Sequence, residues 1–114
     1  MPTKIVVTGG RSYSNDTLLF KILSSFNIEC LYVGDATGAD ELAIKYANSC
    51  NIPTRVFKAD WVKYGKAAGP IRNYEMLDAA GEMAIVVAFL GGLGTKNCCS
   101  QAHNRRMIVL RVEE

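Results

Sequence analysis

The run Ala84-Ile85-Val86-Val87-Ala88-Phe89-Leu90, followed by Gly91-Gly92-Leu93-Gly94-Thr95, decides the fold class of this chain. The run before the glycines is apolar without a break, which is typical of a strand buried on both faces of a parallel sheet. The glycines then form a tight connection to a helix that we expect to end near Arg106. Because this is the most apolar strand of the chain, we predict that it lies at the centre of the sheet.

The rest of the chain alternates between short apolar runs and amphipathic segments. The short runs have the length and β-branched content of strands, and they are residues 4–8, 30–33, 54–58 and 107–112. After Ser14 or Asn15 as a cap, apolar residues recur at helical spacing, namely Leu19, Ile22, Leu23 and Phe26, and Asn27 is the expected stop. A second helix is predicted over residues 39–50.

The segment 59–70 differs in character, because it combines lysines, glycines and a proline with the lone Trp61. We expect an ordered loop there, with at most a short turn of helix. Pro70 suits the first turn of the next helix, where its missing N–H costs no hydrogen bond, and Gly81 ends that helix. Five strands alternating with four helices predict an α/β fold, in which a doubly wound parallel five-stranded sheet lies between two helical layers.

Length and composition narrow the class of protein. With 114 residues, we predict a single domain spanning residues 1–114. No apolar run reaches the roughly 20 residues that cross a bilayer, and no signal peptide is apparent, so no membrane partner is expected. A net charge of +2 is too small for a protein that coats nucleic acid.

The four cysteines do not form a recognisable metal or disulfide pattern. Cys98 and Cys99 are adjacent, no C-x-x-C is present, and His103 is the only histidine. We expect reduced thiols in a cytoplasmic protein, with neither a metal nor a cofactor. His103 is interpreted as part of a solvated helix end.

Ligands of open parallel sheets bind outside the carboxyl ends of the strands, and the unusual residues of this chain fall there. The candidate residues follow four predicted strands: Gly9, Gly10 and Arg11; Asp35, Gly38 and Asp40; Trp61, Arg72 and Asn73; Gly91, Gly92, Gly94 and Thr95. Tight turns need glycine whether or not a ligand binds, so one such loop alone is ambiguous. Four of them at one edge, with two arginines, favour a binding site.

Glycines at these positions are suited to phosphate. Without a Cβ, backbone N–H groups approach an anion closely, and the following helix adds the positive end of its dipole. The segment 91–95 is the best phosphate loop, and Arg11 and Arg72 can donate forked hydrogen bonds. Neither the P-loop pattern nor the dinucleotide G-x-G-x-x-G pattern is present, since Lys96 follows Thr95 and the first strand is followed by only two glycines.

These motifs together resemble the YspA-type, cpYpsA-related branch of the SLOG superfamily. The matching segments are Gly9-Gly10-Arg11, Gly38-Ala39-Asp40, Asp60-Trp61, Ala68-Gly69-Pro70-Ile71-Arg72-Asn73 with Met76, and residues 89–95. The resemblance spans residues 5–112. It implies a Rossmann-like fold that binds a nucleotide or a nucleotide-derived small molecule.

The related LOG proteins hydrolyse the N-glycosidic bond of nucleoside 5′-monophosphates, and their phosphate loop reads P-G-G-x-G-T-x-x-E. Residues 91–95 match its core and Arg72 matches its arginine, but Leu90 replaces the proline and Cys98 replaces the glutamate. Cleavage through an oxocarbenium-like transition state needs a carboxylate. The departure at Cys98 therefore favours binding or sensing over hydrolysis. LOG relatives are dimers or larger, which suggests a homo-oligomer.

Several roles stay open at this point. If the chain is a hydrolase, Asp35 is the first candidate for the catalytic carboxylate, together with Arg72, while Asp40 can instead balance the charge at a helix N-terminus. Trp61 either stacks on a base or closes the core under the loop, and Asn73 either binds a ribose hydroxyl or holds the loop. Single-stranded DNA binding is a further alternative, which the small net charge argues against.

Overall fold

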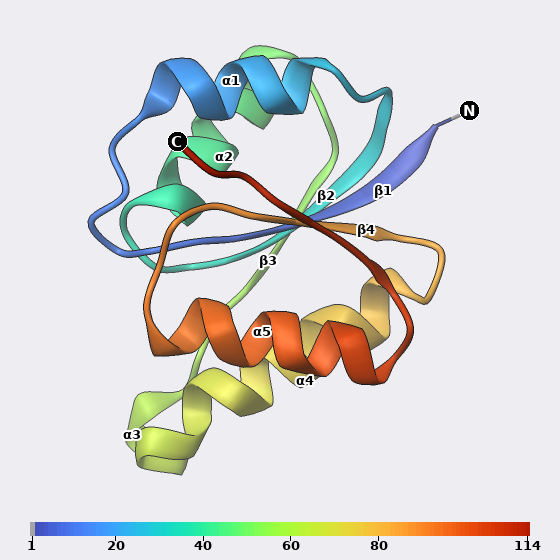
Figure 1. The fold of residues 1–114 in the computed structure, drawn as a ribbon. Coiled ribbons are helices and arrows are strands. Elements are labelled where there is room, and N and C mark those ends of the chain that lie inside the picture. Colours follow the sequence, from blue (N-terminus) through green and yellow to red (C-terminus); the bar gives the residue numbers. More distant parts are fainter. Residues whose placement is uncertain (1) are drawn as a thin grey trace.

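The computed structural model describes residues 2–114, which form one parallel sheet with helices on both faces (Figure 1). The strands are β1 (Thr3–Thr8), β2 (Ile28–Gly34), β3 (Thr54–Phe57), β4 (Ile85–Ala88) and β5 (Ile108–Arg111). The helices are α1 (Asp16–Ser24), α2 (Ala39–Ser49), α3 (Trp61–Tyr64), the 3-10 turn η1 (Gly65–Ala67), α4 (Ala68–Ala80) and α5 (Leu93–Asn104). All four strand pairings are parallel, and the order is β3-β2-β1-β4-β5. The predicted Rossmann-like α/β fold is confirmed.

The central strand is β1, and the prediction that β4 is central was wrong. Ile5, Val6 and Val7 of β1 have no exposed surface, because β2 and β4 flank the strand and helices cover both of its faces. An uninterrupted apolar run shows only that a strand is buried on both faces, and β1 and β4 share that property. From β1 the chain continues to β2 and β3 on one side of the sheet, and then crosses to β4 and β5 on the other side. The carboxyl ends of β1 and β4 therefore flank the topological switch point, where ligands of such sheets bind.

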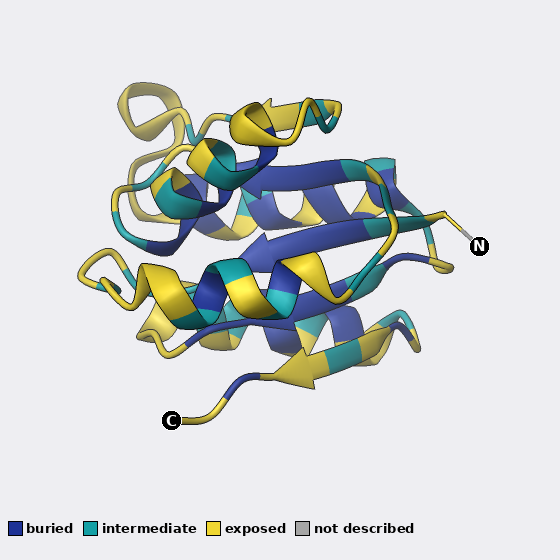
Figure 2. Ribbon diagram, turned by 90° about the horizontal axis from the view of Figure 1, so that it is seen from above, coloured by how far each residue is buried: buried dark blue, intermediate teal, exposed yellow. Residues whose placement is uncertain are grey.

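The helices form two layers, one on each face of the sheet, and each layer packs against its own apolar core. Leu19 and Leu23 of α1 pack with α2 on one face, whereas Met76 and Leu77 of α4 pack with α5 on the other face. The views in Figures 1 and 2 show these layers, with buried central strands and exposed outer sides of the helices.

Local signals explain where the helices begin and end. The Asn15 side chain accepts a hydrogen bond from the Leu18 N–H at 3.1 Å and so caps α1. This helix ends at Ser24, before the expected stop at Asn27. At its end, the hydroxyls of Ser24 and Ser25 donate to backbone carbonyls of the last turn.

The segment expected to be mainly a loop is largely helical. Asp60 caps α3 by accepting the Lys63 N–H at 3.0 Å, and Gly65 ends that helix with a φ of 56°. The 3-10 turn then leads directly into α4, whose first turn contains Pro70 as predicted. Within residues 2–114, no helix is long and apolar enough to cross a membrane.

Gly38 allows the loop after β2 to pack closely against the loop after β1. Its φ is +75°, and a Cβ at this position would overlap the backbone carbonyl groups of Gly10 and Arg11. The close approach allows two hydrogen bonds, from Ala39 N–H to Gly10 O at 3.1 Å and from the Thr37 hydroxyl to Arg11 O at 3.0 Å. The loops after these two neighbouring strands are therefore held together by backbone contact.

We expect Gly38→Ala to destabilise the protein more than Gly81→Ala does. Gly81 has a similar positive φ of 86°, but a Cβ there meets nothing within 4 Å. Gly81→Ala should cost about 1–3 kcal/mol through backbone conformation alone, because its φ of 86° and ψ of 166° lie in a region that is essentially restricted to glycine. Gly38→Ala adds the steric overlap and should cost at least about 1 kcal/mol more. Urea denaturation of both variants measures the difference, and equal losses would show that the two loops do not depend on this contact.

Candidate functional site

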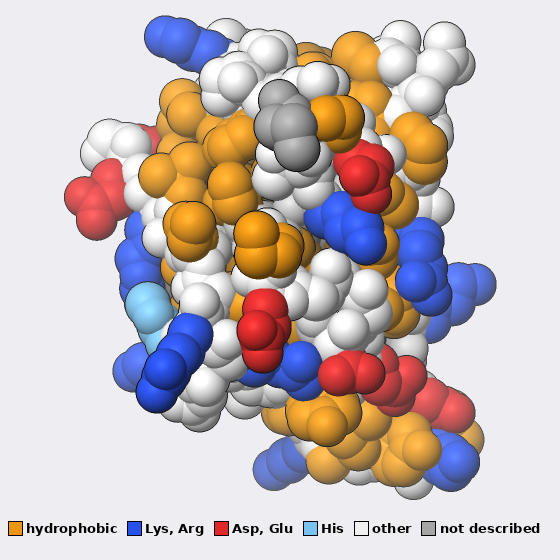
Figure 3. Space-filling view, turned by 90° about the vertical axis from the view of Figure 1, so that its right-hand side faces the viewer, with side chains coloured by type: hydrophobic (Ala, Val, Ile, Leu, Met, Phe, Trp, Pro, Cys, Tyr) orange, Lys and Arg blue, Asp and Glu red, His pale blue; other side chains and the backbone are white. Residues whose placement is uncertain are grey.

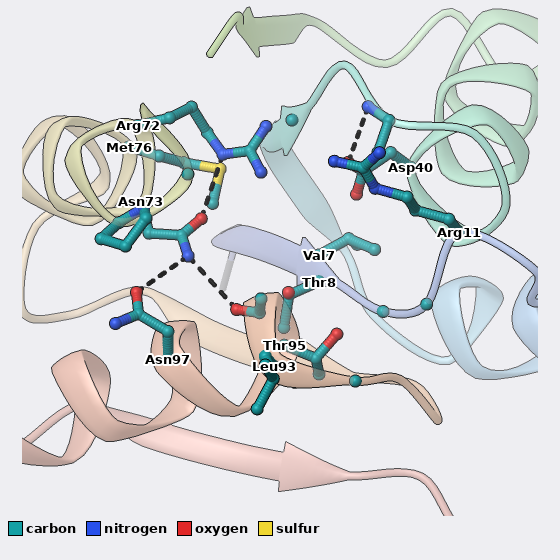
Figure 4. Close-up of a pocket in the computed structure, with 18 of the residues that line it drawn as sticks. Val7, Thr8, Arg11, Asp40, Arg72, Asn73, Met76, Leu93, Thr95 and Asn97 are labelled. Carbon is teal, nitrogen blue, oxygen red and sulfur yellow. Dashed lines mark hydrogen bonds between the residues drawn. The ribbon is translucent and has the colours of Figure 1, made fainter. Parts of the chain in front are cut away.

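A cavity of about 650 Å³ opens at the carboxyl ends of β1, β2 and β4 (Figure 4). The α3–η1 segment and the first turns of α4 and α5 complete its walls. The predicted site residues that line it are Gly9, Gly10, Arg11, Asp40, Trp61, Arg72, Asn73, Gly92, Gly94 and Thr95. Residues far apart in the sequence therefore meet in one cavity.

The first wall is the N-terminus of α5. Gly92 is the residue before the helix, and no side chain caps the helix end. A Cβ at Gly92 or Gly94 would meet nothing within 4 Å, so the first turn is open toward the cavity. The Thr95 hydroxyl lies against Gly91, where a Cβ would overlap it. An uncapped helix start with a nearby hydroxyl is suited to an anion.

Arg72 forms the opposite wall, from α4. Its Nε donates to Asn73 Oδ1 at 3.0 Å, and its Nη1 contacts Asp35 and the Phe57 carbonyl oxygen, both at 3.4 Å. Its Nη2 makes no hydrogen bond with the described residues. The guanidinium is therefore held on one side and has donors left for a ligand.

Asn73 joins α4 to α5. Its side chain is buried, and its Nδ2 donates to the Gly94 carbonyl at 3.3 Å and to Asn97 Oδ1 at 3.1 Å, while its Oδ1 accepts from Arg72. Gln101 also donates to Asn97 Oδ1, at 2.8 Å. These bonds fix the start of α5 relative to Arg72, so the amide of Asn73 is engaged in positioning the two walls.

Asp40 lies in the first turn of α2 and is buried, with 5% of its surface exposed. Its Oδ2 accepts a hydrogen bond from the Ala36 N–H at 3.1 Å. Burial raises the pKa of this carboxyl to about 6, although the bond from Ala36 and the charge of Arg72 oppose the rise. Asp40 thus binds the loop before its helix and does not act as the N-cap, which is Gly38.

Gly34, the last residue of β2, leaves the space in which Arg72 and Asp40 approach each other. A Cβ at Gly34 would overlap Nη1 of Arg72 and would lie 2.7 Å from Oδ2 of Asp40. Figure 4 shows the two side chains directed toward one another from opposite sides of the cavity. No sequence pattern singled out Gly34, because it reads as an ordinary strand end.

Arg11 and Trp61 meet across the cavity. The Arg11 guanidinium carbon lies 5.5 Å from the centre of the Trp61 ring, and the indole is about half exposed at 47%. The ring also packs near Gly69 of α4. Trp61 therefore does not close a core, and its aromatic ring belongs to the wall of the cavity.

Three predicted site residues do not line this cavity. Asp35 is partly exposed and pairs with Arg72 at 3.4 Å. Gly38 packs behind the wall, and Gly91 lines an adjoining hollow of about 460 Å³ together with Gly10, Arg11 and Gly92.

Sequence reasoning missed Thr8, Lys66 and Asn97, which line the cavity. Thr8 is a polar residue at the end of a buried strand, and that signal could have identified it. Asn97 lies one helical turn after Gly94, on the side of α5 that faces Asn73.

Cys98 does not line the cavity and has no exposed surface. Burial raises the pKa of its thiol to about 12, so the group is neutral at physiological pH. Among residues 2–114, no cluster of histidine, cysteine or acidic residues is arranged to hold a metal ion.

Comparison with known proteins identifies the family. A model described as the YspA, cpYpsA-related SLOG family matches residues 3–64, which is more than half of the chain and includes the Gly9-Gly10-Arg11 and Gly38-Ala39-Asp40 motifs. The gene 61 protein of Mycobacterium phage D29 is 26% identical over 118 residues, and the match covers 94% of each chain. No solved structure matches. The chain therefore belongs to the YspA, cpYpsA-related SLOG family, and this membership indicates nucleotide-related ligand binding in general.

Proposed function

We propose that the protein binds or senses a nucleotide or nucleotide-derived ligand in this cavity, with a phosphate at the N-terminus of α5. The observation that carries the proposal is the uncapped, open first turn of α5, which faces the same cavity as the Arg72 guanidinium. Backbone N–H groups and the helix dipole stabilise a phosphate at such a site. Thr95 and Arg72 can add hydrogen bonds to its oxygens.

The remainder of the cavity suits a sugar and a base. Its volume of about 650 Å³ lies within the range of small-molecule sites. The half-exposed ring of Trp61 offers a face on which a base can stack, in contact with Arg11. We infer that the phosphate lies near α5 and the base near Trp61.

Single-stranded DNA has less support as a ligand. The net charge is only +2. On the face shown in Figure 3, basic and acidic side chains are interspersed among apolar ones, and the side chains drawn there form no continuous basic stripe.

A second candidate function is hydrolysis of the N-glycosidic bond of a nucleoside 5′-monophosphate, and the position of Asp40 favours it. Asp35 pairs with Arg72 outside the lining, whereas Asp40 lies in the wall with a pKa of about 6, which is suited to a general base. Binding takes precedence because Cys98, at the position of the LOG glutamate, is buried and carries no carboxylate.

Free adenine released from adenosine 5′-monophosphate, and lost in Asp40→Asn, would establish the hydrolase. The release is measured by chromatography of the reaction mixture. We expect no release, because the carboxylate of the LOG motif is missing, and the nucleotide should be recovered intact from a mixture in which binding is measured in parallel.

We expect at least one nucleotide to stabilise the protein in a thermal-shift screen of nucleoside phosphates, cyclic nucleotides and ADP-ribose. A ligand at about 1 mM with a Kd of about 10 µM adds roughly 2.7 kcal/mol to the free energy of unfolding. The absence of a shift with every compound would contradict the proposed function.

Gly94→Asp should abolish phosphate binding without destabilising the protein. A Cβ at position 94 meets nothing within 4 Å, and an acidic residue in the first turn of a helix is favourable by about 0.3–1 kcal/mol. The same carboxylate repels a phosphate at this helix end. Calorimetry measures affinity and urea denaturation measures stability, with Met83→Ala, exposed at 92%, as the control. Unchanged affinity in Gly94→Asp would place the phosphate elsewhere.

A further inference from the structure

Asp40 is the only carboxylate among the described residues that line the cavity, and the same lining contains three basic residues, Arg11, Lys66 and Arg72. A buried carboxylate normally has partners for both of its oxygens, because burial of a charge without them is costly. Asp40 has a protein partner for only one oxygen, and its other oxygen reaches solvent, because no fully buried side-chain oxygen of the described residues lacks a partner.

Only one oxygen of Asp40 is engaged. Oδ2 accepts the Ala36 N–H at 3.1 Å, whereas Oδ1 makes no hydrogen bond with the described residues. Arg72, which could have neutralised it, forms its ion pair with Asp35 at 3.4 Å. Since Asp40 is 5% exposed and lines the cavity, the cavity is the direction from which a partner can reach Oδ1.

The chemistry of that partner is restricted. A second phosphate is excluded, because a carboxylate repels it. A cationic group would meet the repulsion of Arg11 and Arg72, both of which interact electrostatically with Asp40. A neutral O–H or N–H donor satisfies the carboxylate without bringing further charge into the cavity.

We propose that Oδ1 of Asp40 accepts a hydrogen bond from a neutral donor of the bound nucleotide, a sugar hydroxyl or a base amino group, and that this bond determines which nucleotides the cavity accepts. The inference rests on the proposed function, since it requires a nucleotide in the cavity. A site built to hydrogen-bond a donor discriminates strongly against an analogue that lacks it, because its own polar group is then left unpaired.

The experiment compares nucleotides that differ by one donor. Affinities for the four ribonucleoside 5′-monophosphates, their 2′-deoxy analogues and inosine 5′-monophosphate are measured by calorimetry, or by the fluorescence of the sole tryptophan, Trp61. The 2′-deoxy compounds test the sugar 2′-hydroxyl, and inosine monophosphate, which lacks only the 2-amino group of guanosine monophosphate, tests that base amino group.

Asp40→Asn is the informative variant. The single amide oxygen of asparagine can keep the bond from Ala36, so the NH2 group is then presented to the ligand, where a donor meets a donor. Asp78→Asn is the control, because it makes the same chemical change at an exposed side chain that pairs with Arg105 at 3.4 Å and lies outside the cavity.

We expect the wild type and Asp78→Asn to prefer the donor-bearing nucleotide by about tenfold or more. In Asp40→Asn this preference should fall below about threefold. If the wild type shows no preference, or if Asp40→Asn retains it, the inference is wrong while the proposed function stands. If no nucleotide binds to the wild type, the proposed function itself fails.

A second measurement needs no variant. The ionised carboxylate is the better acceptor, and Asp40 has a pKa of about 6 in an environment that includes Arg11, Asp35, Arg72 and the neutral thiol of Cys98. The preference should therefore be full above about pH 7 and decline as the pH falls through 6. The nucleotides share one phosphate, so its own titration cancels in the ratio of affinities. A ratio that does not change between about pH 7.5 and pH 5 would contradict a role for Asp40.

Discussion

The backbone of Gly10 joins three of the connections that build the cavity. Its N–H donates to the Leu90 carbonyl at 2.9 Å, after β4, and its own carbonyl accepts the Ala39 N–H at 3.1 Å, after β2. The connection after the central strand thus lies between its two neighbours and is bonded to both. Because these bonds involve only backbone, the side chains of the three loops are left to form the wall of the cavity. Gly38 makes this arrangement possible through its positive φ and its missing Cβ.

The cavity that results is asymmetric in charge. The open start of α5 and the basic side chains of Arg11, Lys66 and Arg72 favour an anion, whereas Asp40 is the only acidic side chain among the described residues that line the cavity. Asn73 hydrogen-bonds to Asn97 and to the Gly94 carbonyl, so the protein's own bonds fix the start of α5 relative to Arg72. Under the proposed function, this asymmetry suits a molecule with two chemically different ends, such as a nucleotide.

Much of this arrangement follows from the sequence. Glycine loops after parallel strands meet at one edge because all strands run in the same direction, and ten of the predicted residues line one cavity for that reason. The order of the strands did not follow, because the core residues of both β1 and β4 are buried and only the strand pairing shows which strand is central. The roles of Asp35 and Asp40 depend on side-chain direction. Asp35 directly follows β2 but turns to Arg72, while the geometry of α2 turns Asp40 into the cavity. Lys66 was missed because its position depends on the short turns of α3 and η1.

The contact between Arg11 and Trp61 has a kinetic consequence. A cation–π contact at a partly exposed site is worth about 0.5–1 kcal/mol, which corresponds to an equilibrium constant of only a few. The two side chains therefore separate for a considerable fraction of the time. Rotation of exposed side chains takes picoseconds to nanoseconds, which is much shorter than the interval between encounters with a ligand at cellular concentrations. Under the proposed function, separation of Arg11 from Trp61 would therefore not limit the rate at which a ligand associates.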